Sequence, residues 1–180
     1  MRSPLRRRVI QTCWPALALL AVSCQQPAAV LLRQADNSGA GLSSIVYTGD
    51  PNSAPQLIKG FFEIEDYSWR WTAQRFSVIL RPPAGATGES ATLAMGLAVS
   101  DGVIAKLGNI TLDAAIGPTS LSPETYTKSG SYTYKREVSA SLLTNEEVQV
   151  DFWLDKAMKP DGRDIRELGI IVSSVGLEPR

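Results

Sequence analysis

Apolar and polar side chains alternate in short runs along most of the chain after residue 44. From Ala91 to Val99 every second residue is a large apolar one, and from Val148 to Leu154 the side chain of Trp153 falls on the opposite side from that of Phe152. A period of two predicts a β-strand with one buried face. Further strands are expected over the remaining runs of this kind, which are Ile45–Tyr47, Leu57–Glu65 and residues 69–72, 75–80, 109–116, 124–127, 132–138 and 168–177.

Turn-forming residues separate these runs. Asp101-Gly102 has the composition of a two-residue hairpin turn, which predicts that another strand starts at Val103. Helical patterns are confined to single turns at residues 141–143 and 163–167. Eight or more short strands at regular spacing therefore predict an all-β fold, a single antiparallel β-sandwich of jelly-roll type, over residues 45–180.

The start of the chain differs in composition from this body. Arg2 and residues 6–8 form a positive segment, and the mostly apolar run that follows, residues 9–22, is shorter than the ~20 residues that span a bilayer. This order predicts an export signal over residues 1–23. Residues 24–44 contain glycine, serine and asparagine with little periodicity, which predicts a flexible tether.

The end of the export signal, Leu20-Ala21-Val22-Ser23-Cys24, resembles the lipobox of bacterial lipoproteins, although the position three residues before the cysteine holds Ala21 and not the commoner leucine. The resemblance implies that Cys24 is lipidated, with palmitate among its acyl chains, and anchors the protein to a membrane of the bacterial cell envelope, facing the periplasm or the exterior. The alternative is ordinary signal cleavage that leaves Cys24 a free thiol. We favour lipidation because an unpaired thiol is a liability in an oxidising compartment.

Composition excludes several kinds of chemistry. The 180 residues contain no histidine, and both cysteines, Cys13 and Cys24, lie within the first 24 residues, so the body can hold no Ser-His-Asp triad, Cys-His dyad, Cys/His zinc site or disulfide. Of the 18 basic residues four lie in the export signal, which leaves 14 against 18 acidic residues, interspersed along the body. This mildly acidic balance argues against a nucleic-acid partner. No cofactor is expected, and the acidic turn at residues 161–164 lacks the oxygen spacing of an EF-hand, so no metal is predicted.

Two groups of aromatic residues are candidates for ligand binding. Trp69 and Trp71 lie two apart in a predicted strand and share a face, where they could stack on sugar rings, or else fill the core. Arg70 points the other way and is expected to reach solvent or an acidic partner. Tyr132 and Tyr134 share a face with Arg136, a strip suited to hydroxylated ligands or, alternatively, a solvated cross-strand ladder.

Catalysis is not expected. Glu63 and Glu65 lie on one face of one predicted strand, whereas hydrolysis of a glycoside needs two carboxylates that face each other across a cleft.

Several short segments resemble carbohydrate-binding-module-like jelly-roll domains of bacterial exported proteins. The resemblance spans about residues 57–178 and rests on the segments 60–62, 69–72, 75–78, 154–156, 161–163 and 167–172. It implies a sugar ligand but assigns no role to any single residue. We therefore expect an exported, lipid-anchored binding module, non-catalytic, with carbohydrate as the favoured ligand. The alternative is a structural or assembly lipoprotein of the envelope that binds a protein partner and no small molecule.

Overall fold

The computed structural model describes residues 41–84 and 89–180, and within this part most of the regular secondary structure is β-strand. The predicted all-β, antiparallel fold is confirmed, because every strand pair is antiparallel and the described strands join into one nine-stranded sheet. The strands are β1 (Ile45–Tyr47), β2 (Leu57–Glu65), β3 (Trp69–Leu80), β4 (Ala91–Val99), β5 (Ile110–Ile116), β6 (Thr119–Tyr126), β7 (Gly130–Val138), β8 (Val148–Leu154) and β9 (Ile171–Pro179).

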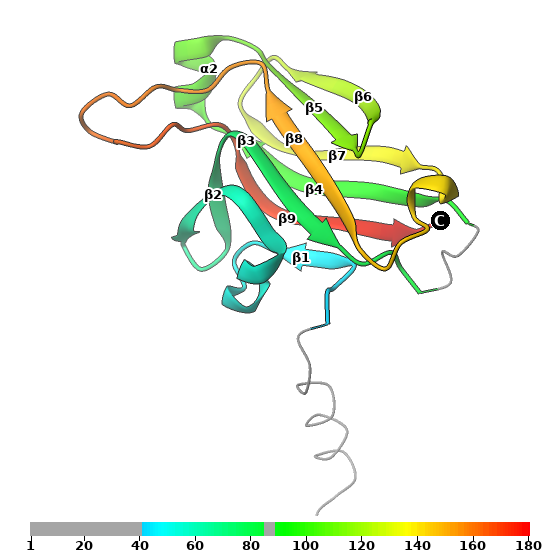
Figure 1. The fold of residues 1–180 in the computed structure, drawn as a ribbon. Helices are drawn as coiled ribbons and strands as arrows, with labels where there is room; N and C mark the ends of the chain where they lie inside the picture. Colours follow the sequence, from blue (N-terminus) through cyan, green and yellow to red (C-terminus); the bar gives the residue numbers. More distant parts are fainter. Residues whose placement is uncertain (1–40, 85–88) are drawn as a thin grey trace, which may run out of the picture. The chain divides into compact units, whose positions relative to one another are not determined.

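The sheet folds over on itself into two layers, and β3 belongs to both. The C-terminal half of β3 pairs with β8, while Arg70 and Trp71 near its start pair with β9. The first layer therefore has the order β2-β3-β8-β5-β6, and the second has the order β3-β9-β4-β7, with β1 added on β9. In Figure 1, β8 crosses in front of β4 and β9.

Alternating side chains from both layers form the core between them. Every second residue of β4, β5 and β8 is buried, as the period of two predicts. The Phe76 ring of β3 stacks on the Phe152 ring of β8 at 5.0 Å between centroids, and Tyr134 of β7 meets Phe152 edge-on at 6.5 Å. The contact between Tyr134 and Phe152 joins one layer to the other.

The predicted hairpin at Asp101-Gly102 is wrong. Residues 101–107 form helix α2 (Asp101–Leu107), which Ser100 caps by accepting a hydrogen bond from the Val103 N–H at 3.2 Å. The physical reason lies in the topology, because β4 belongs to the second layer and β5 to the first, and a two-residue turn cannot cross the sandwich. The buried Val103 side chain fixes the helix on the core during that crossing.

Two other local predictions need adjustment. Residues 163–167 form no helical turn and belong to a loop, whereas the predicted turn near 141–143 is a short 3₁₀ helix, η2 (Ala140–Leu142). A further 3₁₀ helix, η1 (Pro51–Gln56), follows β1. Strand β6 begins at Thr119 and forms a hairpin with β5, which makes it longer than the strand expected at 124–127.

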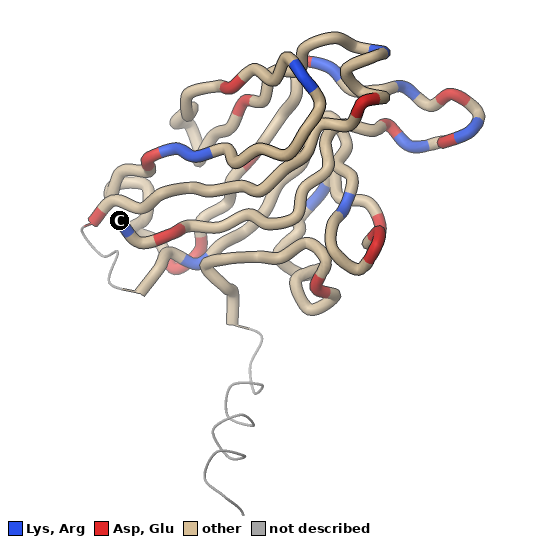
Figure 2. Tube along the Cα trace, turned by 180° about the vertical axis from the view of Figure 1, so that it is seen from behind, with Lys and Arg blue, Asp and Glu red and all other residues tan. Residues whose placement is uncertain are grey.

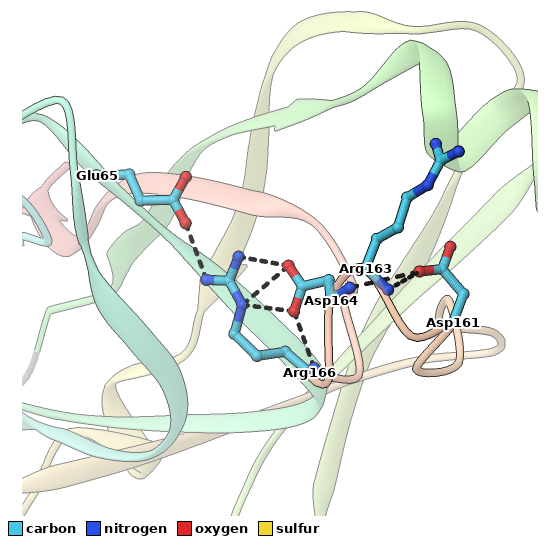
Figure 3. Close-up of polar contacts among 5 residues, drawn as sticks. All are labelled: Glu65, Asp161, Arg163, Asp164 and Arg166. Atoms are coloured by element: carbon cyan, nitrogen blue, oxygen red, sulfur yellow. Dashed lines mark hydrogen bonds and ion pairs between the residues drawn. The ribbon is translucent and has the colours of Figure 1, made fainter.

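The loop between β8 and β9 projects from the sandwich and carries basic and acidic residues in alternation (Figure 2). Arg166 holds it against β2, because its guanidinium lies 2.8 Å from the Glu65 carboxylate and 2.7 Å from that of Asp164 (Figure 3). The same guanidinium lies over the Phe62 ring. Hydrogen bonds from Arg166 lower the pKa of Asp164 to about 2. Asp161 binds Lys106 of α2 at 2.7 Å, so the loop is fastened at two points.

The predicted export signal and Cys24 lie outside the described residues. At the end of the predicted tether, Ser43 and Ser44 are hydrogen bonded to the domain through their carbonyl oxygens, which accept from Arg81 and Leu177. Within residues 41–84 and 89–180, no helix is both long enough and apolar enough to span a membrane.

Candidate functional site

Trp69 and Trp71 project from the outer face of β3, where both are partly exposed. Their rings meet edge to face, with 6.2 Å between centroids and 82° between planes. The two indoles are therefore neither fully buried nor coplanar, and their role in sugar binding stays a prediction. Trp71 is among the partly buried side chains that pack against the core.

The expectation that Arg70 reaches solvent or an acidic partner is wrong. Its side chain is only 8% exposed, and its guanidinium donates to two backbone carbonyls, that of Thr48 at 2.9 Å and that of Phe62 at 2.7 Å. These carbonyls belong to two other segments, the turn after β1 and strand β2. Arg70 is therefore a structural clamp, in which carbonyl dipoles replace water around the buried charge.

Tyr134 and Arg136 close one edge of the sandwich. Tyr134 is fully buried, and its hydroxyl donates to the Ser122 carbonyl of β6 at 3.0 Å. The Arg136 guanidinium lies 4.2 Å from the centre of the Tyr134 ring, donates to the same carbonyl and pairs with the Glu124 carboxylate at 3.0 Å. The polar groups of both residues thus join β7 to β6 and are committed to contacts within the protein.

Tyr132 lies beside this edge and packs on Tyr126, with 4.7 Å between ring centroids. Its hydroxyl donates to the Lys128 carbonyl at 2.9 Å. Tyr126 is buried, and its hydroxyl has no hydrogen-bond partner among the described residues. Burial, and then the nearby Glu124 carboxylate, raise the pKa of Tyr126 above its ordinary value, and burial raises that of Tyr134 as well.

Of the five predicted ligand-binding residues, the structure brings Trp69 and Tyr132 to one hollow of about 350 Å³. Its floor is made of Gly96 and Ala98 on β4, which have little or no side chain. A Cβ at position 96 would lie 2.8 Å from the Ser173 hydroxyl oxygen, so any larger residue there would have to displace this hydroxyl. The result is a shallow hollow on the second layer with an indole at its rim.

A larger groove of about 490 Å³ crosses the outer face of the first layer. Residues from all five of its strands line it, so the groove runs across the strands and not along them. The side chains with polar or aromatic character are Lys59 of β2, Arg75 of β3, Ser120 of β6, and Gln149, Asp151 and Trp153 of β8.

The sequence analysis did not identify this groove. It placed Trp153 on the outer face of β8, and this is confirmed, because Phe152 is buried and Trp153 is partly exposed. The groove is formed by outward-facing residues of neighbouring strands, and Arg75 and Trp153, for example, are opposite each other in the register of β3 and β8. That register cannot be obtained from a sequence in which the two residues lie 78 positions apart.

Asp151 is held in place in the floor of the groove. Its Oδ1 atom accepts the hydroxyl hydrogen of Ser77 and an amide hydrogen of Gln149 at 3.0 Å, and it lies 3.9 Å from the Lys59 ammonium. Ser77 is completely buried, so its hydroxyl fixes the carboxylate from below. Among the described residues no donor contacts Oδ2, which leaves that oxygen as an acceptor for a bound hydroxyl.

Acidic side chains are scarce among the described residues of this groove. Asp151 is the one carboxylate among the described residues that line it, whereas glycoside hydrolysis uses a pair of carboxylates on opposite sides of the scissile bond. Across residues 41–84 and 89–180, no three carboxylates come close enough together to hold a metal ion.

The chain matches no protein-family model and no curated protein. It is similar to the solved structure of TmCBM27, a carbohydrate-binding module with specific mannan recognition, at 12% sequence identity and a TM-score of 0.43, over 77% of this chain and 97% of that chain. It is also similar to a CBM4 structure at 14% identity and a TM-score of 0.36, over 81% of this chain and 91% of that chain. At this level of identity and superposition, neither similarity identifies a ligand of this chain.

Proposed function

We propose that the domain binds carbohydrate, without catalysis, in the groove across β2, β3, β8, β5 and β6. The observation that carries the proposal is the convergence of one indole, one fixed carboxylate, one amide and two cationic side chains in a single open groove. A sugar ring presents an apolar C–H face and a rim of hydroxyl groups. A site for it therefore needs an aromatic surface together with donors and acceptors of hydrogen bonds.

Each of these groups has a role in the proposed complex. The Trp153 ring supports the C–H face of a sugar, and Asp151 Oδ2 accepts a hydrogen bond from a ring hydroxyl. Arg75 is exposed and, among the described residues, has no hydrogen-bond partner for its guanidinium, so its donors are available to hydroxyl or carboxylate oxygens of the ligand. Because the groove is open and crosses five strands, it suits a segment of a chain and not only its end.

Substitution of Trp153 tests this proposal. We expect Trp153→Ala to weaken binding in the groove at least tenfold, about 1.4 kcal/mol, because the aromatic surface is lost. The measurement is a titration of ¹⁵N-labelled protein with oligosaccharides chosen from a glycan array, followed at the amides of Ala115 and Gln149 in the groove. Ile165→Ala, on the exposed loop, is the control and should bind as the wild type does.

The array should also include the double variant Trp69→Ala/Trp71→Ala, since these indoles are the sequence-derived candidates. Loss of binding in this variant, together with unchanged binding by Trp153→Ala, would move the site to the second layer. No binding of any glycan by the folded wild type would refute the proposal and favour the alternative, a protein partner in the envelope.

We further propose that the protein is exported and held on a membrane of the bacterial envelope by lipid on Cys24, facing the periplasm or the exterior. The support is the order of a basic segment, a short apolar run and a lipobox-like cysteine in the sequence. Mass spectrometry of the wild type and of Cys24→Ala after expression in a bacterium tests this. Acyl chains should be found on the wild-type cysteine alone, and an unmodified Cys24 would overturn the proposal.

A further inference from the structure

A third hollow, of about 540 Å³, lies where the turn after β1 meets the tip of the β2–β3 hairpin. Two tyrosines line it, Tyr47 and Tyr67, and both are unusually exposed, at 63% and 96%. The remaining lining consists of Gly49 and of small polar or acidic residues, namely Asp50, Ser68, Ser173 and Ser174. The sequence analysis named neither tyrosine.

The two turns that form this hollow are fixed against each other. Gly49 makes the close approach possible, because a Cβ at this position would lie 2.6 Å from the Ser68 Cα atom. Next to Gly49, the buried Thr48 makes two backbone contacts. Its carbonyl accepts a hydrogen bond from the Arg70 guanidinium, and its N–H donates to the Ser173 carbonyl at 3.0 Å. These contacts fix the backbone positions of Tyr47 and Tyr67 relative to each other.

Tyr67 is an unusual residue for the backbone conformation that its hairpin turn requires. Asp66 and Tyr67 are the two central residues of the hairpin turn, with φ angles of +50° and +53°. A turn of this kind favours Asn-Gly, because residues with a Cβ are strained in the left-handed region. The chain instead holds a strained tyrosine there and exposes its ring almost completely, beside a hollow. Strain of this sort, retained without a packing benefit, points to a role in binding.

The lining favours a neutral, hydroxylated ligand. The aromatic rings offer surfaces for the C–H face of a sugar, and the serine hydroxyls can both donate and accept hydrogen bonds. Asp50 uses Oδ1 to cap Asn52, at 2.9 Å from its backbone nitrogen, and no described residue donates to Oδ2. No described residue that lines the hollow has a basic side chain, so these residues supply none of the cationic groups that an acidic sugar would require, in contrast to the groove with Lys59 and Arg75.

We propose that this Tyr47–Tyr67 hollow is a second carbohydrate site, which takes a neutral sugar. The inference rests on the proposed function in that the ligand is again a carbohydrate, but it concerns separate residues on separate strands. With one site on each layer, the domain binds two saccharides at once. A polysaccharide presented at high density is then held more tightly than the affinity of either site provides.

Tyr67→Gly separates a binding role from a structural one. Glycine relieves the left-handed strain, so the variant should melt at the same temperature as the wild type or higher, while the hollow loses its aromatic surface and binds at least tenfold more weakly. The probes are neutral hexasaccharides of glucose, mannose and xylose. Binding is followed by calorimetry for stoichiometry and by the amide shifts of Ser68 and Ser174 for location. Ile165→Gly, which also removes a highly exposed side chain (87%), is the matched control.

We expect two saccharides per chain for the wild type and for Ile165→Gly, one for Tyr67→Gly and one for Trp153→Ala. The second site would be overturned if Tyr67→Gly bound two saccharides and if the saccharide shifted the Ser68 and Ser174 amide signals as much as it does in the wild type. A single saccharide on the wild type that disappears in Trp153→Ala would also overturn it, while leaving the proposed function intact. Binding that disappears in Tyr67→Gly and persists in Trp153→Ala would support the hollow and refute the groove.

Discussion

Arg70 provides the sharpest test of how the fold is held together, because it is a buried cation paired with carbonyls and not with an acid. The substitution Arg70→Met keeps most of the aliphatic stem but removes the guanidinium. The Thr48 and Phe62 carbonyls then lose the donors that lie at 2.9 and 2.7 Å. Since the two carbonyls belong to two different segments, the turn after β1 and strand β2, both attachments to β3 weaken together.

The magnitude follows from these two hydrogen bonds. A hydrogen bond to a charged group contributes about 1.5–3 kcal/mol, and carbonyls left without partners add a desolvation penalty. Relief of the cost of burying the guanidinium offsets part of this loss. We therefore expect the free energy of unfolding to fall by about 3 kcal/mol, which for a domain of this size lowers Tm by roughly 10 °C.

The assay is urea unfolding followed by circular dichroism, together with thermal melting, for Arg70→Met and for Arg163→Met. Arg163 is exposed on the β8–β9 loop, so its replacement by methionine should change the free energy of unfolding by less than about 0.5 kcal/mol. If Arg70→Met unfolded at the same urea concentration as this control, the clamp would contribute nothing and our interpretation of the buried arginine would be wrong.

Three further predictions concern single side chains. Tyr126→Phe should stabilise the domain by about 1 kcal/mol, because it removes a buried hydroxyl that has no partner among the described residues. Tyr134→Phe should destabilise the domain by about 1 kcal/mol, because it removes a hydrogen bond. Urea unfolding measures both changes. The folded-state pKa of Asp164, about 2, is below its ordinary 3.8, so the stability that the ionised carboxylate contributes is present above pH 4 and is lost as pH falls toward 2. The difference in unfolding free energy between wild type and Asp164→Asn should therefore vanish between pH 4 and pH 2. A difference that stays constant over this range would contradict the prediction. Gly49→Ala should push the turn after β1 away from Ser68, because the added Cβ has no room there; stability should fall by about 1–3 kcal/mol and amide exchange at Ser68 should become faster. Unchanged exchange at Ser68 would argue against the close approach of Gly49 to Ser68.

The strands were largely predictable because a single buried face imposes a period of two on the sequence. Strands β1, β2, β4 and β8 have the bounds that their patterns predict. Helix α2 was not predictable from its seven residues, since Asp101-Gly102 suits a hairpin turn equally well. Only the placement of β4 and β5 in different layers decides between them, and this is a property of the whole fold.

The candidate sites were less predictable than the strands, for a physical reason. Alternation gives the face on which a residue lies, but not which residues from other strands lie beside it. Tyr134 and Arg136 suit a ligand by their chemistry, yet their polar groups are used across the sandwich edge by Ser122 and Glu124. Conversely, the groove around Trp153 depends on register between strands, and the exposure of Tyr67 depends on a turn conformation that tyrosine rarely adopts.

The sharing of β3 between the layers has a consequence for how the domain comes apart. Strand β3 is the common spine of both layers, because residues 75–80 pair with β8 while Arg70 and Trp71 of the same twelve-residue strand pair with β9. Release of one half of the strand therefore disturbs the support of the other half. Melting should therefore be all-or-none, and loosening that begins at either face should reach the opposite face through this spine.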